Sequence, residues 1–206
     1  MTKNTKEHIL EIAFLLFLQK SFKAVTIKEI VEETGVSKGA FYHYFDSKKQ
    51  LFEAVTKHFY LDVFVQDFDS YSKTSLNSFY HDVLADARKT FLSLKKVSNK
   101  KMQFDINNYQ LIFEAVKLLP EFNRAMKAHN IKELDCWKNV VGSAQENGEI
   151  RSDIAKESIA ATFIHIADGF GMERILIGSH KNSEKSLKGL QKLYDDYYRI
   201  LKKEQK

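Results

Sequence analysis

The chain has 206 residues, of which 44% are hydrophobic and 29% charged; this composition excludes a disordered protein and leaves room for one or two hydrophobic cores. Its single cysteine, Cys136, excludes an internal disulfide framework and a multi-cysteine zinc site, and suits the reducing cytoplasm. The longest apolar run, Ile12 to Leu18, is too short for a membrane span, no secretion signal is expected, and the net charge of +5 permits nucleic-acid binding without requiring it.

The first predicted helix begins near Asn4, which precedes Glu7 by three residues in a typical capped start. Its apolar residues recur at helical spacing and share one face. They are Ile9, Ile12, Ala13, Leu16 and Phe17.

Two short helices follow, and each is predicted to begin at a capping side chain. Thr26 can cap the first while Glu29 reaches back to it, and Val25 can pack on Ile30 as a hydrophobic staple. Ser37 can cap the second. Gly35 lies between them, where a tight turn needs unusual backbone angles, so residues 25–44 have the spacing of a helix-turn-helix.

Longer helices are predicted for the rest of the chain, with Pro120 opening one and Gly148 closing it. The fold class is therefore all-α, with about nine helices. A compact N-terminal domain is expected over 2–62 and a larger helical domain over 63–206. The predicted longer helices are 48–68, 75–95, 103–118, 120–146, 156–178 and 184–203.

The second short helix divides cleanly by face. Phe41, Tyr44 and Phe45 are three and four residues apart and share the side that faces the core. Lys38, Gly39 and Tyr42 share another side, with His43 at its border. A helical glycine costs about 1 kcal/mol relative to alanine, and close approach of the backbone to a DNA major groove would justify that cost.

Lysines occupy the first positions of two predicted helices. Lys38 opens one, and Lys48 and Lys49 open the next, capped by Ser47. The positive end of the helix dipole disfavours cations there by about 0.3–1 kcal/mol. An external phosphate reverses the sign, which favours contact with a DNA backbone. An ordinary solvated role is the alternative for any one of these lysines.

The sequence from Thr26 to Phe52 closely resembles the signature of the tetracycline-repressor (TetR) family, and Gly148 to Asp153 resembles the family's connection into its last two helices. Ser21 departs from the family, which usually has glycine there, as does Asp46, which adds a negative charge. The resemblance implies that residues of this segment contact DNA phosphates or base edges, and that Gly39 allows the helix to approach the DNA closely. The predicted DNA-binding residues are Thr26, Lys28, Ser37, Lys38, Gly39, Tyr42, His43 and Lys48.

Two late predicted helices carry apolar stripes at alternating spacings of three and four. Such stripes suit either a helical interface between two subunits or the core of one subunit. The resemblance favours a homodimer formed by these two helices. The predicted interface residues are Phe163, Phe170, Leu190, Tyr194 and Tyr197.

The resemblance also implies a pocket for a small-molecule effector among the middle helices. The aromatic candidates, most of which could equally be plain core, include Phe79, Tyr80 and Phe91. His165 and Asp168 could orient a polar ligand or simply pair with each other. The residues predicted to line the pocket are Tyr109, Phe113, Trp137 and His165.

The leading hypothesis is a regulator that binds double-stranded operator DNA and is released by an unknown small molecule. An activator of the same family and a helical protein-interaction module are the alternatives. An enzyme is not expected, since Cys136 has no obvious base beside it and no metal-ligand pair or glycine-rich phosphate loop is present. No cofactor and no metal are expected.

Overall fold

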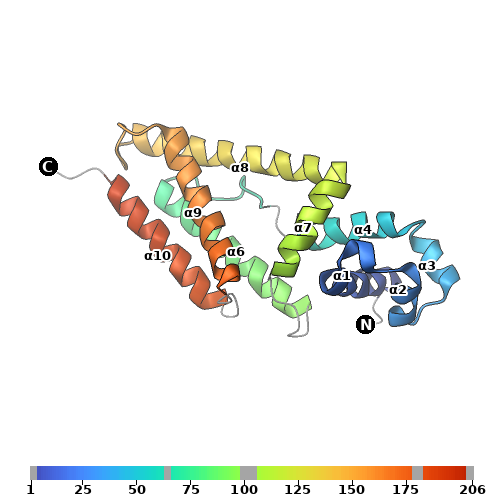
Figure 1. Cartoon of the computed structure of the whole chain (residues 1–206). Coiled ribbons are helices and arrows are strands. Elements are labelled where there is room, and N and C mark those ends of the chain that lie inside the picture. Colours follow the sequence, from blue (N-terminus) through green and yellow to red (C-terminus); the bar gives the residue numbers. More distant parts are fainter. Residues whose placement is uncertain (1–3, 63–65, 98–105, 178–182, 203–206) are drawn as a thin grey trace. The chain divides into compact units, whose positions relative to one another are not determined.

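The computed structural model describes residues 4–62, 66–97, 106–177 and 183–202, and the side chains of 91–97 and 183 lie outside this description. The described parts contain nine α-helices and one π-helix, and their β pairing is confined to an isolated bridge between Ile150 and Lys202 (Figure 1). The predicted all-α class is confirmed. The chain forms two compact units, Met1–Val65 with Asp105–Lys127, and Gln66–Phe104 with Ala128–Lys206.

The first unit is built around its first helix, which packs against α2, α4 and α7. Aromatic rings fill the space between these helices: Phe14 stacks on Phe59 at 4.1 Å, and Phe17 meets Phe52 edge-on at 5.2 Å. The elements of this unit are α1 (Thr5–Ala24), α2 (Ile27–Thr34), α3 (Lys38–Tyr44), α4 (Lys48–Thr56), the π-helix η1 (Lys57–Leu61) and α7 (Ile106–Leu118).

The predicted helix starts are confirmed by their capping hydrogen bonds. Asn4 Oδ1 accepts from Lys6 N at 3.1 Å, and Thr26 Oγ1 accepts from Glu29 N at 3.2 Å. Ser37 Oγ and Ser47 Oγ accept in the same way from the amides three residues on, each at 3.1 Å. Gly35 ends α2 with φ of +68°, the left-handed conformation expected for the turn.

The carboxylate of the predicted capping box at α2 has a second partner. Glu29 interacts with the Thr26 backbone amide, as predicted, and also pairs with Lys20 of α1. An opposite charge from a neighbouring helix is a stronger partner for a carboxylate than one backbone amide. The pair lies at the surface and ties α1 to α2.

The prediction of one helix over 48–68 was wrong at its end. The α-helix stops at Thr56, η1 continues to Leu61, and residues 66–68 are not helical. The wider π turn places Phe59 and Tyr60 in the core, each 3% exposed. Tyr60 Oη donates to Asn108 Oδ1 of α7 at 3.2 Å. The change from α-helix to π-helix thus occurs where this segment packs against α1 and α7.

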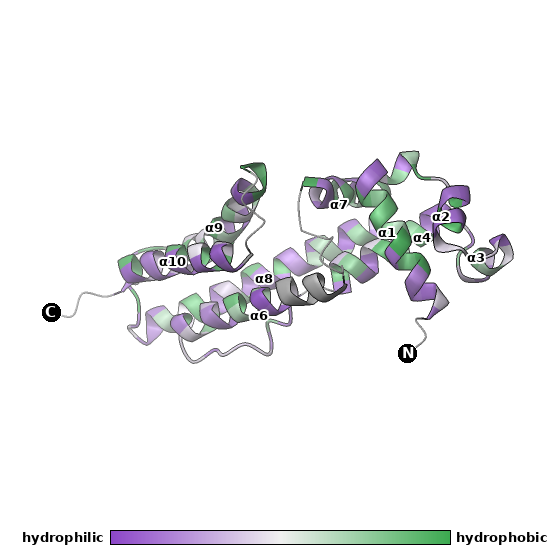
Figure 2. Cartoon of the chain, turned by 90° about the horizontal axis from the view of Figure 1, so that it is seen from below, coloured by the Kyte–Doolittle hydropathy of each residue, from purple (hydrophilic) through white to green (hydrophobic). Residues whose placement is uncertain are grey.

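The second unit contains the later helices close to their predicted bounds. They are α6 (Leu76–Val97), α8 (Pro120–Glu146), of which the first turns belong to the first unit, α9 (Lys156–Leu176) and α10 (Ser183–Leu201). α10 packs against both α6 and α9. Figure 2 shows hydrophobic and hydrophilic residues alternating along these helices, as amphipathic packing requires.

The core of the second unit is largely aromatic. Trp137 of α8 stacks on Phe163 of α9 with ring centroids 4.8 Å apart, and Phe79 meets the indole edge-on at 4.8 Å. Tyr194 of α10 packs edge-on against Phe163 at 5.1 Å. Each of these four side chains is at most 1% exposed. Phe91, a candidate pocket residue, lies outside the described side chains.

Candidate nucleic-acid interface

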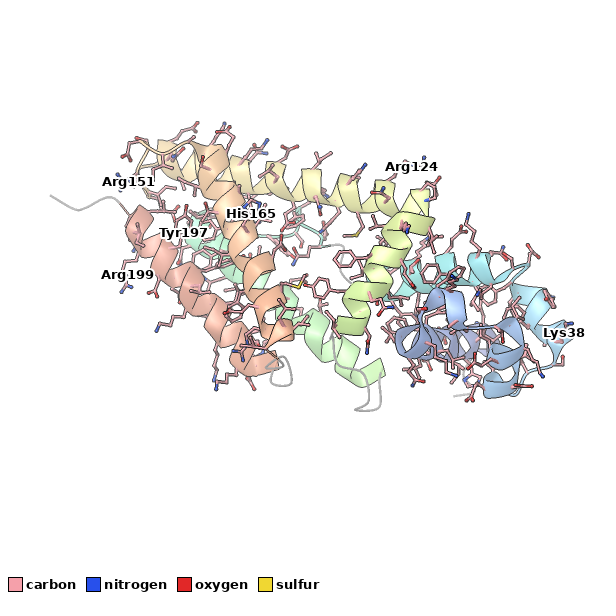
Figure 3. All side chains as sticks on the ribbon, in the orientation of Figure 1. Lys38, Arg124, Arg151, His165, Tyr197 and Arg199 are labelled. Atoms are coloured by element: carbon pink, nitrogen blue, oxygen red, sulfur yellow. The ribbon has the colours of Figure 1, made fainter. Side chains whose placement is uncertain are left out.

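The start of α2 and the outer side of α3 present a continuous set of polar and aromatic side chains. Phe41 and Phe45 are 0% and 2% exposed and attach α3 to the first unit, as predicted. Tyr42 on the opposite side is 43% exposed, and Figure 3 shows Lys38 pointing outward from α3. The predicted residues that the structure places at the surface are Thr26, Lys28, Ser37, Lys38, Gly39, Tyr42 and His43.

Gly39 is not required by the packing of this unit. A Cβ built at Gly39 would meet only Ser37 Oγ, at an ordinary 3.9 Å. Its backbone is helical, so no left-handed conformation demands glycine there. The absence of a side chain on this exposed surface is therefore unexplained by the fold, and it would let an external surface come close to α3.

Positive charge gathers at the N-terminal end of α3. Lys38 occupies the first position, and the first turn has no acidic residue. Lys28 on α2 makes an exposed pair with Glu32 at 3.8 Å, which contributes little and can exchange for another anion. Lysine N–H groups and the free amides of a helix start bind the same kind of ligand, a phosphate.

Lys48 has a different environment from the other predicted DNA-binding residues. Its Nζ donates to the carbonyls of Phe22 at 2.8 Å and Val25 at 2.7 Å, with Lys23 O at 3.4 Å. It also lies 4.5 Å from the centre of the Phe22 ring. An ammonium has three N–H groups, and these contacts occupy them. These contacts stabilise the C-terminal end of α1, and a phosphate contact by Lys48 stays a prediction.

The electrostatics of Lys48 agree with this internal role. Burial lowers the pKa of its ammonium, and the nearby Glu114 carboxylate of α7 acts in the opposite direction. Glu114 Oε2 also accepts from Phe22 N at 2.9 Å. Glu114 was not singled out from the sequence, since its partners lie far away in the chain.

The four predicted effector residues lie in two places. Tyr109 and Phe113, with rings 6.2 Å apart, lie on α7 in the first unit and line an apolar pocket of about 340 Å³. Trp137 is buried in the second unit, where its side chain interacts with the Glu133 carboxyl, and His165 is exposed on α9. The pocket residues are Ile106, Tyr109, Gln110, Phe113, Glu114 and Lys117.

The second unit holds an acidic pair that sequence reasoning identified only in part. Burial raises the pKa of Glu133 on α8 to about 7, with Asp168 of α9 acting in the same direction. Burial likewise raises the pKa of Asp168, and His165 lowers it. Trp137 favours the charged form of Glu133. The predicted neighbours His165 and Asp168 therefore interact, and the unexpected member is Glu133.

The predicted dimer residues differ in how much of their surface one chain already covers. Phe163 and Tyr194 are 0% and 1% exposed, so a second copy could contact neither without unfolding this core. Phe170 packs over Gly189, where a Cβ would lie 2.8 Å from the ring. Leu190 and Tyr197 are half-buried; Figure 3 shows Tyr197 among the side chains of α10.

The exposed side of α2 and α3 indicates the class of protein. Within the described residues, no group of three His, Cys, Asp or Glu side chains is placed to hold a metal ion. None of the helices in the same part of the chain is long and apolar enough to cross a membrane. A three-helix head whose third helix, α3, is exposed and begins with a lysine is typical of helix-turn-helix DNA-binding proteins.

Comparison with known proteins agrees with this class. The model of the tetR family of bacterial regulatory proteins matches residues 9–55. Over 74% of the chain and 71% of the relative, the sequence is 25% identical to the HTH-type transcriptional repressor KstR2 of Rhodococcus jostii. It is 23% identical to the repressor AcnR of Corynebacterium efficiens over 93% of the chain and 89% of the relative.

A solved structure, KstR2 of Mycobacterium tuberculosis, shares the fold with a TM-score of 0.63 at 16% identity, covering 99% of this chain and 98% of that one. The chain carries a domain of the tetR family of bacterial regulatory proteins over residues 9–55. It is a DNA-binding transcriptional regulator.

Proposed function

We propose that the protein is a repressor that binds operator DNA as a homodimer and is released by a small-molecule effector. The relatives KstR2 and AcnR, both named repressors, support repression over activation. Residues 2–62 would form the DNA-binding domain and 63–206 the effector-binding and dimerisation domain. α7, which comes from the second of these stretches, packs against α1 and α4. A cytoplasmic location fits the single free thiol, Cys136.

The DNA contacts would come from the exposed side of α2 and α3. α3 would enter the major groove with Tyr42 and His43 toward base edges, while Lys38 and the helix start meet a phosphate. The observation that carries this proposal is Gly39, an exposed helical glycine that the fold does not require. Thr26, Lys28 and Ser37 would contact the backbone from the two capped helix starts.

Replacing Tyr42 by alanine is expected to weaken binding to a duplex selected by the wild-type protein by about five- to a hundredfold, or about 1–3 kcal/mol. The side chain is 43% exposed, so the fold should persist. Fluorescence anisotropy across a salt series gives the measurement, and wild-type affinity should fall steeply with added salt.

Ile131→Ala is the matched control for Tyr42→Ala, since Ile131 on α8 is 63% exposed and lies outside the proposed interface. It should bind DNA as the wild type does. Unchanged affinity of the Tyr42 variant would remove this residue from the interface. If the wild-type protein binds no duplex at low salt, the alternative of a protein-interaction module is favoured instead.

The effector would be an apolar or amphipathic molecule. The candidate contacts are Tyr109 and Phe113 for a site in the first unit, and Trp137 and His165 for a site in the second. The buried Trp137 and its neighbour Glu133 supply polar groups within an aromatic environment. A solved complex of SmeT with triclosan has the same fold, with a TM-score of 0.62 at 18% identity, covering 98% of this chain and 93% of that one. That neighbour binds a small molecule.

The dimer would form through α9 and α10. Large apolar side chains remain exposed there in a single chain: Leu176, Ile177, Leu193 and Ile200 are 68%, 63%, 42% and 66% exposed. Leu193 and Ile200 are two turns apart and share a face of α10. Analytical ultracentrifugation is expected to show a dimer that the double substitution of Leu193 and Ile200 by aspartate dissociates. A stable wild-type monomer at micromolar concentration would contradict the proposal.

A further inference from the structure

The chain between α1 and α2 is held in an unfavourable conformation. Ser21 has φ of +70° and ψ of 161°, a region of backbone space populated almost exclusively by glycine. A non-glycine residue keeps such angles only where its surroundings impose them. Five residues later, Thr26 caps α2 and begins the proposed DNA-binding surface.

Side chains from two helices form hydrogen bonds with Phe22, the residue that follows Ser21. Glu114 Oε2 of α7 accepts the Phe22 amide proton at 2.9 Å, and Lys48 Nζ of α4 donates to the Phe22 carbonyl at 2.8 Å. Lys48 Nζ also donates to Val25 O at 2.7 Å, directly before Thr26. We call this set of contacts, made by Glu114 and Lys48 to residues 22–25, the junction clamp.

The clamp is half-buried and rigidly supported. The Phe22 ring packs on Phe52 at 4.5 Å and lies under the Lys48 ammonium. Val25 is fully buried, so its carbonyl cannot move freely. α7 is anchored separately at its first turn, where Asn108 accepts from Tyr60 Oη. The placement of the start of α2 therefore depends on the position of α7.

We propose that Glu114 is a positioning residue for DNA binding: by holding the Phe22 amide it maintains the strained Ser21 conformation and sets the placement of Thr26 and α2. Lys48 completes the clamp from α4 and balances the carboxylate. Glu114 also lines the pocket with Tyr109 and Phe113. If the proposed effector binds there, which rests on the proposed function, it meets the clamp directly.

Glu114→Ala tests the proposal without any effector. It removes the acceptor, and affinity for a duplex selected by the wild-type protein from a random pool should fall by about three- to thirtyfold. Glu114→Gln keeps an acceptor oxygen and should stay close to wild type. Glu53→Ala, an exposed glutamate on α4 outside the pocket and the clamp, is the matched control and should change nothing.

Rescue distinguishes positioning from a general loss of stability. Ser21→Gly adopts the required angles without strain, so in the Glu114→Ala background it should recover most of the lost affinity. Hydrogen exchange of the Phe22 amide should accelerate in Glu114→Ala and remain slow in Glu114→Gln.

Two results would overturn the inference. The first is wild-type affinity in Glu114→Ala despite fast exchange at Phe22, and the second is an affinity loss that Ser21→Gly does not reverse. If Glu114→Ala fails to fold, the folded Glu114→Gln protein decides the test. A fall of about three- to thirtyfold in its affinity would overturn the inference as well. A wild-type protein that selects no duplex would contradict the DNA-binding function, which is a separate outcome.

Discussion

Replacing Phe163 by alanine is expected to lower the free energy of unfolding by about 3–5 kcal/mol. The ring is 0% exposed and is enclosed by Trp137, Tyr194 and Tyr197, with centroid distances of 4.8, 5.1 and 4.9 Å. Alanine would leave a cavity between α8, α9 and α10 that these rigid rings cannot fill. Urea unfolding followed by circular dichroism, at one protein concentration, measures the change.

Leu176→Ala on the same helix is the control for this large effect. Leu176 is 68% exposed in one chain, so its replacement should change the stability of the monomeric unit by less than about 0.5 kcal/mol. Its effect should appear instead in the concentration dependence of the dimer. A small loss for Phe163→Ala would show that Phe163 does not pack in the core of one chain.

The second large effect is a dependence of stability on pH that originates at Glu133. Burial and Asp168 raise the pKa of this carboxyl from 4.5 to about 7 in the folded chain. The folded state therefore binds the proton more tightly than the unfolded state. This contribution to stability is complete below pH 4.5 and is lost as the pH rises through about 7. The loss amounts to about 2–4 kcal/mol.

The groups around Glu133 set the sign and size of this effect. Asp168 of α9 is itself shifted upward by burial, which adds to the loss at higher pH, while His165 and Trp137 favour the charged carboxylates. Glu133→Gln should therefore be more stable than the wild type at pH 8, and the difference should shrink toward pH 5. Urea unfolding at several pH values makes the comparison.

Glu146→Gln, an exposed glutamate at the end of the same helix, is the matched control for Glu133→Gln. It should leave the pH profile of the wild type unchanged. If Glu133→Gln and the wild type keep a constant difference between pH 5 and 8, the raised pKa of Glu133 is contradicted.

Local signals predicted the DNA-binding head well. Capping residues act on amides two or three positions away, so Asn4, Thr26, Ser37 and Ser47 could be assigned from spacing, and each makes the expected hydrogen bond. The helical period of α3 separated its buried residues from its exposed ones for the same reason. The later helices also agree closely, because long amphipathic patterns leave few alternatives.

Side chains whose partners are distant were harder to assign. Lys48 was expected at a phosphate, yet its carbonyl partners lie 23 to 26 residues earlier, and Glu114 bonds an amide 92 residues away. Phe163 and Tyr194 belong to an apolar stripe that fits a core and an interface equally well. Only their enclosure by other helices places them in the core.

For this protein, sequence alone determined the all-α class, the capped helix starts and the faces of the short helices, since each depends on interactions within one or two turns. Tertiary structure decided where the long flexible charged side chains end, which aromatic rings are covered, and which backbone strain is tolerated. The physical reason is that hydrogen bonds and packing act over a few ångströms in space, whatever the separation along the chain, as the junction clamp at Ser21 to Val25 shows.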